Sequence, residues 1–494
     1  MSANIAFLIE SNLQNGLGHL MRCRNLAIYL NNNAKIYFLI INNNNLEDEI
    51  FYRKKLKGFS LTFFKKNNDF VNQLIIKLKK FKIDELVIDI YNFNYKNEKK
   101  ISNSIINITV IDDFPSRNYY CNKLICYTPN QNQKKFEKKN KNFNCKYFLG
   151  INYFINDYKQ NYLRKSYIKN FQKKIKLNIN HNSVLINLGG FDKKLNTLKL
   201  LNFFIQNNFF KNFKFYICVG SNILLLKKIE ILIKQFKNIF IVSLNENLNK
   251  YYAKVDFVIG AGGISSYERV FFGVPSLNLA LYNNQKLNVE IFKNLNLAIK
   301  LNIRKINDII FSIKKLYKFQ KKFHINSLMI SDLNKNKFNK ILFENKTNEE
   351  LMFKIAQNKD MKYFYKIQNQ KNSRDFFINN KAINYNDHKK WFYSKITDPN
   401  YCLFLITVDN MKIGIINLFI NNNFEVEISI LIDYEFRYRG YGTKAIRLIN
   451  NNLYQYTKIA KVHFENVASS KMFKNNKFKL KTKKRKFLTF IYEV

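Results

Sequence analysis

Short apolar runs alternate with helical patterns through the first 340 residues, and this alternation limits the possible folds more than any other feature of the chain. The run Ile5–Ile9, for example, precedes Leu20, Cys23, Ala27 and Leu30, which recur at the spacing of one helix face. Strands that alternate with helices form parallel sheets with helices on both faces. The expected strands form two series, at 5–9, 36–41, 86–90, 108–112 and 124–127, and at 184–188, 215–219, 239–242, 255–259 and 276–279.

The two series predict an α/β fold with two Rossmann-like domains, at residues 1–160 and 161–345, which would face each other across a cleft. Further along the chain the pattern changes to consecutive antiparallel strands, followed by a glycine turn and a helix. This α+β arrangement predicts a third domain at residues 355–494. Its strands are expected at 403–408, 413–420 and 425–432.

The chain is strongly basic, with 83 Lys and Arg against 35 Asp and Glu and a formal charge of +48. Only 12 of the basic residues are Arg, and Lys is abundant together with Asn, Ile, Phe and Tyr. Nucleic-acid binders favour Arg and concentrate their charge on one face, whereas lysines occur here in every segment. We therefore interpret the charge as compositional bias and expect no specific nucleic-acid partner.

The sequence also predicts a cytoplasmic location. The start Met1–Asn4 lacks a basic segment and a cleavage site, and no run approaches the roughly 18 apolar residues of a membrane span. The 6 Cys are far apart without a CxxC pair, which argues against a metal site or a disulfide scaffold. We expect no membrane partner and no metal, and the oligomeric state stays open.

Three glycine-containing segments follow expected strands of the first two domains. The first contains Gly16, Gly18 and His19 and opens the helix that carries Arg22. Glycines let the backbone approach a ligand, and a helix start presents unpaired N–H groups to an anion. A tight turn with an incidental histidine would explain this segment alone. A titratable side chain at a helix start beside a parallel sheet nevertheless makes His19 a candidate catalytic residue.

The second segment closes the expected strand 184–188 and contains Gly189, Gly190 and Asp192. A glycine pair at the carboxyl end of a parallel strand lies where open α/β sheets bind ligands. An ordinary strand-to-helix turn explains the segment about as well, so both interpretations stay open.

The third segment is the richest, because four of the 14 glycines of the chain lie within residues 260–273. Amides around Gly262–Ser265 could cradle a diphosphate, and Glu268 could accept hydrogen bonds from ribose hydroxyls. A capping serine with a solvated Glu268 would not explain the glycine density or the downstream pair Asn284 and Gln285. A binding site is therefore favoured.

Together these segments resemble the UDP-sugar hydrolases of pseudaminic acid biosynthesis, which have the glycosyltransferase-B fold. The resemblance spans about residues 4–340 and includes the Gly-x-Gly-His-x-x-Arg-Cys, Gly-Gly-x-Asp and Gly-Gly-Ile-Ser-Ser-Tyr-Glu motifs. It implies hydrolysis of UDP-2,4-diacetamido-2,4,6-trideoxy-β-L-altropyranose to UDP and free sugar, with His19 orienting or deprotonating water. The implied substrate contacts are Gly16, Gly18, Arg22, Gly189, Gly190, Asp192, Gly262, Gly263, Ile264, Ser265, Ser266, Glu268, Asn284 and Gln285.

The third domain carries Arg437, Arg439, Gly440 and Gly442 between an expected strand and a helix. Such a loop frees backbone N–H groups, adds positive charge and directs a helix dipole at an anion. A basic turn on a solvated face is the alternative. Residues 360–490 resemble the GNAT acetyltransferases, which hold the pyrophosphate of acetyl-CoA on this loop. The implied acetyl-CoA contacts are Ile430, Ile432, Arg437, Arg439, Gly440, Tyr441, Gly442, Thr443, Asn466 and Ser469.

Glu427 is the candidate base that accepts the amine proton, although a plain solvent-facing Glu on a strand is a close alternative. GNAT members often carry Tyr where we align Phe473 and Gly where this chain has Lys477, so the general acid stays open. His388 and Trp391 resemble residues of the sugar-nucleotide N-acetyltransferases. One face of a helix packed on the sheet explains them equally well.

The two resemblances predict a bifunctional enzyme with a UDP-activated amino sugar as its partner and acetyl-CoA as acetyl donor. N-acetylation of a 4-amino sugar nucleotide would produce the diacetamido sugar nucleotide that the first half hydrolyses. The alternative is a UDP-sugar glycosyltransferase-like enzyme fused to a protein N-acetyltransferase or to a noncatalytic acyl-CoA-binding domain.

Overall fold

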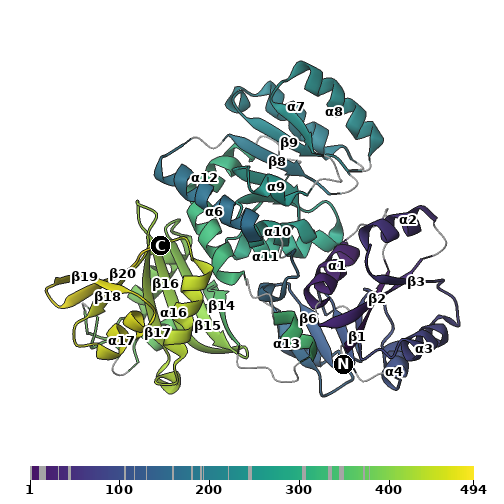
Figure 1. Ribbon diagram of the computed structural model, residues 1–494. Helices are drawn as coiled ribbons and strands as arrows, with labels where there is room; N and C mark the ends of the chain where they lie inside the picture. The colour runs from purple at the N-terminus through teal and green to yellow at the C-terminus, as the bar shows by residue number, and fades with distance from the viewer. Residues whose placement is uncertain are drawn as a thin grey trace. The chain divides into compact units, whose positions relative to one another are not determined.

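A computed structural model of the chain shows three sheets with their helices (Figure 1). It divides into two compact units, Met1–Lys159 with Asp332–Asn348, and Gln160–Ser331 with Glu349–Val494, which we describe separately. Among the described residues no helix is both long and apolar enough to cross a membrane. The described residues are 3–10, 18–31, 33–42, 46–104, 107–115, 117–129, 131–157, 161–179, 182–189, 192, 194–220, 222–242, 247–302, 308–331, 337–343, 350–370, 373–377 and 379–494.

The first unit is built on a parallel sheet of seven strands in the order β3-β2-β1-β4-β5-β6-β7. All five expected strands are present, and the sequence pattern missed only the strands at the two edges, which are short and partly exposed. The strands are β1 (Ala3–Glu10), β2 (Ala34–Ile41), β3 (Ser60–Phe64), β4 (Glu85–Asp89), β5 (Asn107–Ile111), β6 (Lys123–Cys126) and β7 (Lys146–Leu149). The helices are α1 (Gly18–Leu30), α2 (Leu46–Lys55), α3 (Phe70–Lys80), α4 (Tyr95–Ser102), α5 (Gln133–Glu137) and α13 (Lys337–Phe343).

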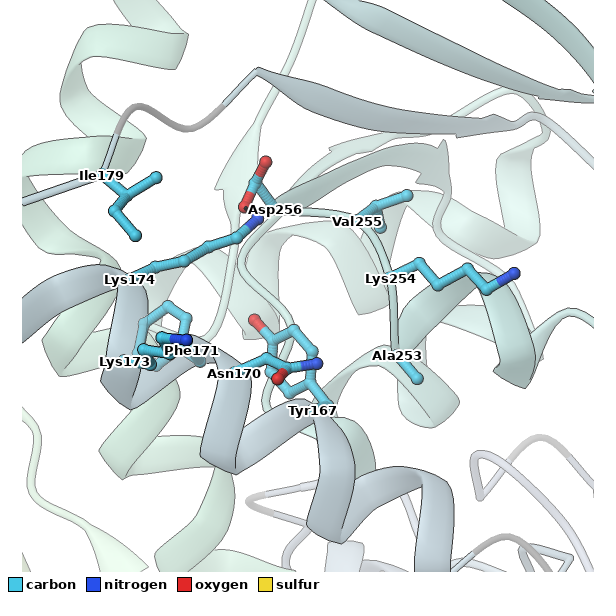
Figure 2. A pocket seen from close by; sticks show the side chains of 10 residues that line it. All are labelled: Tyr167, Asn170, Phe171, Lys173, Lys174, Ile179, Ala253, Lys254, Val255 and Asp256. Carbon is cyan, nitrogen blue, oxygen red and sulfur yellow. Dashed lines mark hydrogen bonds and ion pairs between the residues drawn. The ribbon is translucent and has the colours of Figure 1, made fainter. Parts of the chain in front are cut away.

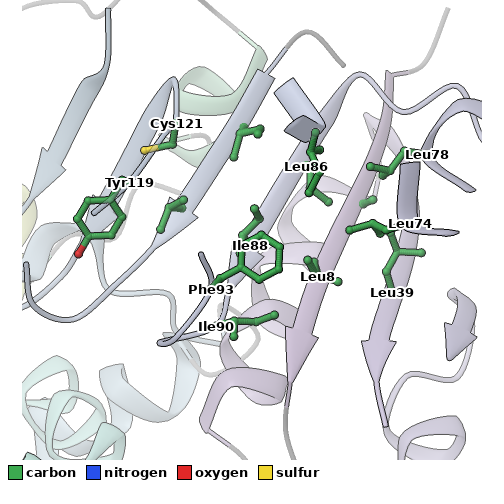
Figure 3. Close-up of a cluster of buried hydrophobic side chains, with 14 of the residues drawn as sticks. Leu8, Leu39, Leu74, Leu78, Leu86, Ile88, Ile90, Phe93, Tyr119 and Cys121 are labelled. Carbon is green, nitrogen blue, oxygen red and sulfur yellow. The ribbon is translucent and has the colours of Figure 1, made fainter. Parts of the chain in front are cut away.

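The core of this unit lies between the sheet and its helices (Figure 3). On α3, Phe70, Leu74 and Leu78 are buried at intervals of four residues, so one face of the helix covers the sheet. On the strands, Leu8 and Leu86 point into the same cluster. Each fully buried side chain of this kind contributes about 1.5–3 kcal/mol, which is why the apolar periodicity determines the helix.

Helix α13 belongs to the first unit although it follows the second parallel sheet in the chain. Lys123 donates a hydrogen bond of 3.1 Å to the carbonyl oxygen of Leu342, and the rings of Tyr29 and Phe338 lie 5.8 Å apart. The chain therefore returns to the first unit after residue 331, whereas the sequence placed residues 161–345 in one domain.

The second unit contains a parallel sheet of six strands in the order β10-β9-β8-β11-β12-β13. All five strands of the second expected series are present. The strands are β8 (Ser183–Asn187), β9 (Lys214–Cys218), β10 (Ile239–Val242), β11 (Phe257–Ala261), β12 (Ser276–Leu279) and β13 (Ile299–Lys300). The helices are α6 (Asn161–Lys176), α7 (Asn196–Gln206), α8 (Ile223–Gln235), α9 (Asn249–Tyr252), α10 (Ile264–Phe272), α11 (Lys286–Asn294) and α12 (Asp308–Ile330). The parallel sheets confirm the α/β prediction, while the glycosyltransferase-B arrangement and its cleft stay predictions.

The third sheet, in the same unit, has the order β14-β15-β16-β17-β18-β20-β19 and is antiparallel except between β17 and β18. The three strands expected for the third domain are confirmed. The strands are β14 (Leu351–Ile355), β15 (Tyr401–Val408), β16 (Met411–Ile420), β17 (Val426–Ile432), β18 (Lys458–His463), β19 (Lys479–Lys484) and β20 (Phe487–Tyr492). The helices are α14 (Met361–Gln368), α15 (Tyr385–Thr397), α16 (Tyr441–Asn452) and α17 (Val467–Asn475).

Helix α12 joins the two sheets of the second unit. The buried Lys322 ammonium donates to the carbonyl oxygens of Ile396 at 2.7 Å and Asp398 at 2.9 Å, and thereby supplies donors to the end of α15. Asn452 at the end of α16 donates to the carbonyl oxygen of Met329 at 2.8 Å. These buried contacts attach the third domain to the second parallel sheet.

A second buried lysine makes stability depend on pH. Lys458 donates to the carbonyl oxygen of Leu453 at 2.8 Å and lies 4.2 Å from the ring centre of Tyr492, and burial lowers its pKa to about 7. Between that pH and the ordinary lysine pKa of about 10.4, the amine is neutral when folded and protonated when unfolded. Unfolding then takes up a proton, so the free energy of unfolding rises with pH across this window, and below about pH 7 this group adds no further pH dependence.

We expect Lys458→Met to remove this rise, which amounts to at most about 1.4 kcal/mol per pH unit. Denaturation of the full chain at pH 6.5, 8 and 9.5 measures it. Trp391, the single tryptophan, lies on α15 of the same domain and reports on this domain selectively. The free energy of unfolding of the variant, relative to that of the original chain, should be highest at pH 6.5 and lowest at pH 9.5. A constant difference at all three values would contradict the assignment.

Candidate functional site

The third sheet opens between its two central strands. Strands β17 and β18 pair only at Val426 with Lys458 and at Glu427 with Ile459, although both continue beyond these pairs. On its other side β17 pairs with β16 along its whole length. Ile428–Ile432 therefore has no ladder partner on the β18 side, and its end is partly exposed at the centre of a sheet. The carbonyl oxygen of Ile432 accepts from Arg437, and the other backbone groups on this side of β17 can bind an extended ligand that carries amide groups.

The open end of β17 leads to the start of α16. Gly440 is the N-cap residue, with a φ of +76°, and open space surrounds the position that a Cβ atom would take. Because glycine has no side chain, it does not cap the first amides of the helix, those of Tyr441, Gly442 and Thr443. A Cβ atom on Gly442 would lie 2.8 Å from the sulfur of Met472 and 3.7 Å from Ile432, so this glycine lets α16 pack closely. The result is a helix start without a side-chain cap, of the kind that can bind an anion, beside strand backbone that β18 does not pair.

The two arginines of this loop have different surroundings. Arg437 donates to the carbonyl oxygen of Ile432 at 3.0 Å and to the hydroxyl of Ser373 at 2.5 Å, so it fastens the loop to the end of β17. Arg439 is exposed, and its guanidinium lies 5.6 Å from the ring centre of Phe436. The sequence placed both on the pyrophosphate. The structure leaves Arg439 accessible for an anion and gives Arg437 a supporting position.

The other expected acetyl-CoA contacts also divide into two groups. Ile430 and Ile432 lie on the open part of β17 and are half-buried. Asn466, in contrast, is the N-cap of α17, and its side chain accepts a hydrogen bond of 2.9 Å from the backbone N–H of Ser469. This pair stabilises the start of α17. Helix capping therefore explains the presence of Asn466 and Ser469 in addition to the expected contact with acetyl-CoA.

Glu427 stands where β17 and β18 separate. Its carboxylate accepts a hydrogen bond of 2.8 Å from Lys461 on β18, and about a third of the side chain is exposed. The side chain is therefore fixed at the base of the opening and accessible from solvent. This position suits a group that accepts a proton from an amine at the opening.

The segment after α14 that carries Ser373 and Phe376 contacts both sides of the opening. Ser373 accepts from Arg437 after β17, and the ring of Phe376 lies 6.1 Å from that of His463 at the end of β18. Gln370 secures the same segment, because its amide donates to Asp433 at 2.7 Å. These residues follow α14 in an irregular stretch without a periodic pattern, so no local signal could have placed them here.

The two departures from the GNAT pattern have structural explanations. Phe473 is buried against Phe478 and Phe490, so it is part of the core. Lys477 has a φ of +68°, the left-handed conformation for which glycine is the usual choice. His388 is buried beside Tyr365 and Trp391, in agreement with the packing interpretation of this histidine.

In the first unit, His19 lies at the switch point of the parallel sheet. The chain proceeds from β1 to β2 and β3 on one side and then crosses to β4 on the other, so β1 and β4 are neighbours at the reversal. His19 is in the first turn of α1, after β1, and Asp89 ends β4. The Nδ1 atom of His19 lies 2.6 Å from Oδ1 of Asp89. Open α/β sheets bind ligands at such switch points.

A buried network holds this His–Asp pair. Arg22 donates to Asp89, to Asp113 at 2.8 Å and to Tyr127. Burial alone would raise the pKa of Asp89, but the positive charge of Arg22 and the hydrogen bonds from Arg22 and His19 hold it well below its ordinary value. A carboxylate at Nδ1 favours the tautomer in which Nε2 accepts a proton.

The structure therefore changes the role of one expected residue and adds another. The sequence placed Arg22 in contact with substrate, whereas its guanidinium is buried and supports the pair. Asp89 was absent from the candidates, although an Asp at the carboxyl end of a buried strand was a signal in the run 86–90. Gly18 begins α1 and is partly exposed, and Gly16 lies outside the described residues.

The second parallel sheet also has a switch point, between β8 and β11. The two expected glycine segments of this sheet follow these two strands. Gly189, after β8, has a φ of +98°, and Gly190 lies outside the described residues. The buried carboxylate of Asp192 accepts from the backbone N–H of Thr197 at 2.7 Å, so Asp192 secures the start of α7. Of this segment, Gly189 remains the accessible candidate.

The glycine density after β11 has packing reasons that the sequence analysis did not recognise. A Cβ atom on Gly260 would lie 2.6 Å from the buried guanidinium of Arg269, and one on Gly262 would lie 2.4 Å from Val289. Gly273 ends α10 with a φ of +74°. The number of glycines alone is therefore not evidence for a ligand, and Gly263 is the one of the four whose Cβ position is not crowded at close range.

The remaining residues of this segment form a small polar group after β11 and β12. The Ser265 hydroxyl accepts from Arg269 at 3.2 Å, and the side chain of Gln285 lies 3.7 Å from the Cβ position of Gly263. Ile264, Ser265 and Glu268 are half-buried. Ser266 is buried and donates to the carbonyl oxygen of Gly263, whereas Asn284 is exposed.

A cavity of about 240 Å³ lies elsewhere in the same domain, between α6 and the residues before β11 (Figure 2). Asp256 accepts from Lys174 and, at 2.9 Å, from the backbone N–H of Ser183. Ser183 and Asp256 stand where β8 and β11 begin. The cavity is therefore at the end of the sheet opposite to the carboxyl ends of the strands, and we assign it no catalytic role.

Comparison with known proteins identifies one part of the chain. A family described as "Acetyltransferase (GNAT) domain" matches residues 343–479, and no curated protein matches the chain. Similar solved structures include a domain from Methanocaldococcus jannaschii DSM 2661, with 19% identity over 30% of this chain and 100% of that one and a TM-score of 0.28. Spermidine N-acetyltransferase from Vibrio cholerae, solved with CoA and spermine, has 16% identity over 29% of this chain and 94% of that chain, with a TM-score of 0.26. An N-acetyltransferase from Staphylococcus aureus Mu50 has 17% identity over 29% of this chain and 98% of that chain, with a TM-score of 0.25. These scores are too low to carry an argument.

The family match and the sheet agree with each other. The matched residues contain the opening between β17 and β18, the start of α16 and Glu427. The family match and the opening are both consistent with acetyl-CoA as the acetyl donor. Residues 343–479 of the chain are thus a GNAT acetyltransferase domain.

Proposed function

We propose that the GNAT domain transfers an acetyl group from acetyl-CoA to the amine of a UDP-activated amino sugar. The observation that carries the acetyl transfer is the opening between β17 and β18, which continues into the uncapped start of α16. The backbone amides at the start of α16, those of Gly442 and Thr443, suit a pyrophosphate, and Ile428–Ile432 suits the amide-containing arm of acetyl-CoA. When bound, acetyl-CoA supplies the acetyl thioester.

Glu427 performs the proton step. The amine must lose a proton as its nitrogen forms the bond to the acetyl carbon and the carbon–sulfur bond breaks. Glu427 receives this proton directly or through water, and Lys461 keeps the carboxylate at the base of the opening. The buried Phe473 is unable to protonate the sulfur, so water donates that proton.

Glu427→Gln is expected to lower kcat for acetyl transfer by about 100-fold, since a general base typically contributes 10²–10⁴-fold. The KM for acetyl-CoA should stay within about threefold, because the amide keeps the size of the side chain and the phosphate site is unchanged. Release of CoA thiol measures both values. Glu435→Gln, at an exposed carboxylate near the same loop, is the matched control and should leave kcat unchanged. An unchanged kcat in Glu427→Gln would remove Glu427 from the reaction.

The acceptor is tested with a panel of amines. We expect CoA release with a UDP-4-amino sugar to exceed that with a polyamine or with a peptide amino terminus. Preference for the peptide would support the alternative of a protein N-acetyltransferase. No CoA release with any amine, together with acetyl-CoA binding, would support a noncatalytic acyl-CoA-binding domain.

The His19–Asp89 pair supports a second function for the parallel-sheet domains. We propose that they hydrolyse a UDP-sugar, with His19 activating water. Asp89 holds the imidazole by Nδ1, so Nε2 accepts the proton of the water that attacks the anomeric carbon. UDP is a competent leaving group, and helix starts stabilise its charge.

Incubation of labelled UDP-2,4-diacetamido-2,4,6-trideoxy-β-L-altropyranose without an acceptor tests this second function. Release of UDP and free sugar in equal amounts is expected. If release required an added sugar or peptide acceptor, the parallel-sheet domains would be a glycosyltransferase. If both functions hold, the chain acetylates a 4-amino sugar nucleotide and then hydrolyses the product.

A further inference from the structure

The last two strands form a hairpin, here called the ribbon, at the edge of the third sheet, where its inner strand β20 pairs with β18. This hairpin has an unusual charge. Between residues 471 and 486 nine of sixteen residues are basic and none is acidic, whereas the whole chain has 83 basic residues in 494. All nine are exposed. They belong to α17, to the connection between α17 and β19, to β19 and to the turn before β20. They are Lys471, Lys474, Lys477, Lys479, Lys481, Lys483, Lys484, Arg485 and Lys486.

Strand β19 forms the edge of the third sheet, and it pairs only with β20 (Figure 1). Every residue of β19 is exposed, so neither face of this strand is covered. Its cations lie on both faces, because Lys484 pairs with Phe487 and Lys483 with Leu488, which is the next residue along β20. The ribbon therefore presents positive charge above, below and at its tip.

Compositional bias does not explain this concentration. Bias distributes basic residues over the chain in proportion to length, which would place about three rather than nine in these sixteen residues. A few edge lysines are common because they prevent strands of two molecules from pairing. That role requires neither cations on both faces nor the further lysines on α17 and in the turn.

We propose that this ribbon, defined as β19, β20 and the turn between them, binds the phosphate backbone of duplex nucleic acid. The outer strand β19 carries cations on both of its faces, and phosphates lie on both sides of the major groove of a duplex. A flat anionic membrane would meet only one face at a time. Lysine as the dominant cation suits contacts with phosphates rather than with bases, so the binding has no sequence preference.

The ribbon lies next to the opening of the GNAT domain. Strand β20 pairs with β18, which carries Lys461, and Lys461 is bonded to Glu427. A polyanion on the ribbon would therefore approach the side of the sheet on which the proposed base lies. The inference does not depend on the acetyl transfer, because binding is measured without acetyl-CoA.

The test compares two fourfold variants of the full chain. The ribbon variant changes Lys479, Lys481, Lys483 and Lys484 to Gln. The control variant changes four exposed lysines on and after α8 to Gln and removes the same total charge. These four are Lys227, Lys228, Lys234 and Lys237. Anisotropy of a labelled 30-base-pair duplex of random sequence, measured at several salt concentrations, gives the affinity and its salt dependence.

We expect the ribbon variant to bind the duplex more than tenfold more weakly at 0.1 M salt. The slope of log affinity against log salt should fall by about 3–4, since each lost phosphate contact contributes about 0.9. The control variant should change the slope by less than 1. All eight lysines are exposed, so melting temperatures should agree and loss of binding would not reflect unfolding.

Three results would overturn the proposal. Equal losses in both variants would show that the overall charge, rather than the ribbon, attracts the duplex. No loss in either variant would place the binding elsewhere. Ribbon-dependent binding to vesicles with 30% phosphatidylserine, without ribbon-dependent binding to the duplex, would identify a membrane surface.

Discussion

Gly440→Asp is expected to weaken binding of CoA by about 100-fold or more, which corresponds to roughly 2.7 kcal/mol. The substitution places a carboxylate at the N-cap of α16, beside the amides of Tyr441, Gly442 and Thr443. That carboxylate competes with the pyrophosphate for the same donors and repels its charge. Calorimetric titration of the full chain with CoA measures the dissociation constant.

Gly440→Asn is the matched control, because Asn has the same shape as Asp and no charge. The φ of +76° is a conformation that Asn and Asp tolerate better than other side chains do, and open space surrounds the Cβ position. Both variants should therefore fold, with melting temperatures that differ by a few degrees at most. We expect Gly440→Asn to lose less than tenfold in affinity. Equal affinities of the Asp variant and the original chain would show that the phosphates bind elsewhere.

His19→Ala is expected to lower the rate of UDP release from the UDP-sugar by about 10²–10⁴-fold, the range that a general base contributes. The substitution removes the group that Asp89 orients through a contact of 2.6 Å. About a sixth of the His19 side chain is exposed, and the buried pairing of Arg22 with Asp89 and Asp113 remains. The fold should therefore persist, which a melting curve checks.

Tyr91→Phe is the control for this experiment. The ring of Tyr91 lies 4.5 Å from that of His19 in an edge-to-face contact, and its hydroxyl donates to Asp113. Phe keeps the ring contact and removes only the hydroxyl, so UDP release should stay within about tenfold of the original rate. Normal UDP release by His19→Ala would exclude His19 from the mechanism. Acetyl transfer should be unaffected by either change, which separates the two proposed functions.

Much of the fold could be predicted from local pattern. The ten expected strands of the parallel sheets are all present, because strands buried on both faces are nearly continuous apolar runs. The missed strands β3, β7 and β13 are at sheet edges, where burial is incomplete and the pattern is weak. The sequence assigned the residues of helix α13 to the second domain, whereas the helix belongs to the first unit. Contiguity in sequence does not determine where a short helix packs.

The candidate sites were predicted less completely. The loop at Gly440 was visible in the sequence because glycine and arginine are rare in this chain. The opposite error occurred at Gly260 and Gly262, where close packing against Arg269 and Val289 requires glycine without any ligand. A glycine motif shows only that a side chain is absent. The tertiary structure decides whether a ligand or a neighbouring residue occupies the space that the side chain would take.

The sequence by itself determined the buried strands of the parallel sheets and the loops that follow them, because apolar periodicity and glycine act locally. The tertiary structure alone decided which strands are neighbours. It joined β1 to β4, and thereby brought Asp89 to His19, which is 70 residues away. It also separated β17 from β18 after two residue pairs, which creates the opening of the GNAT domain. Strand order and divergence follow from packing of the whole sheet against its helices, and no local pattern records that packing.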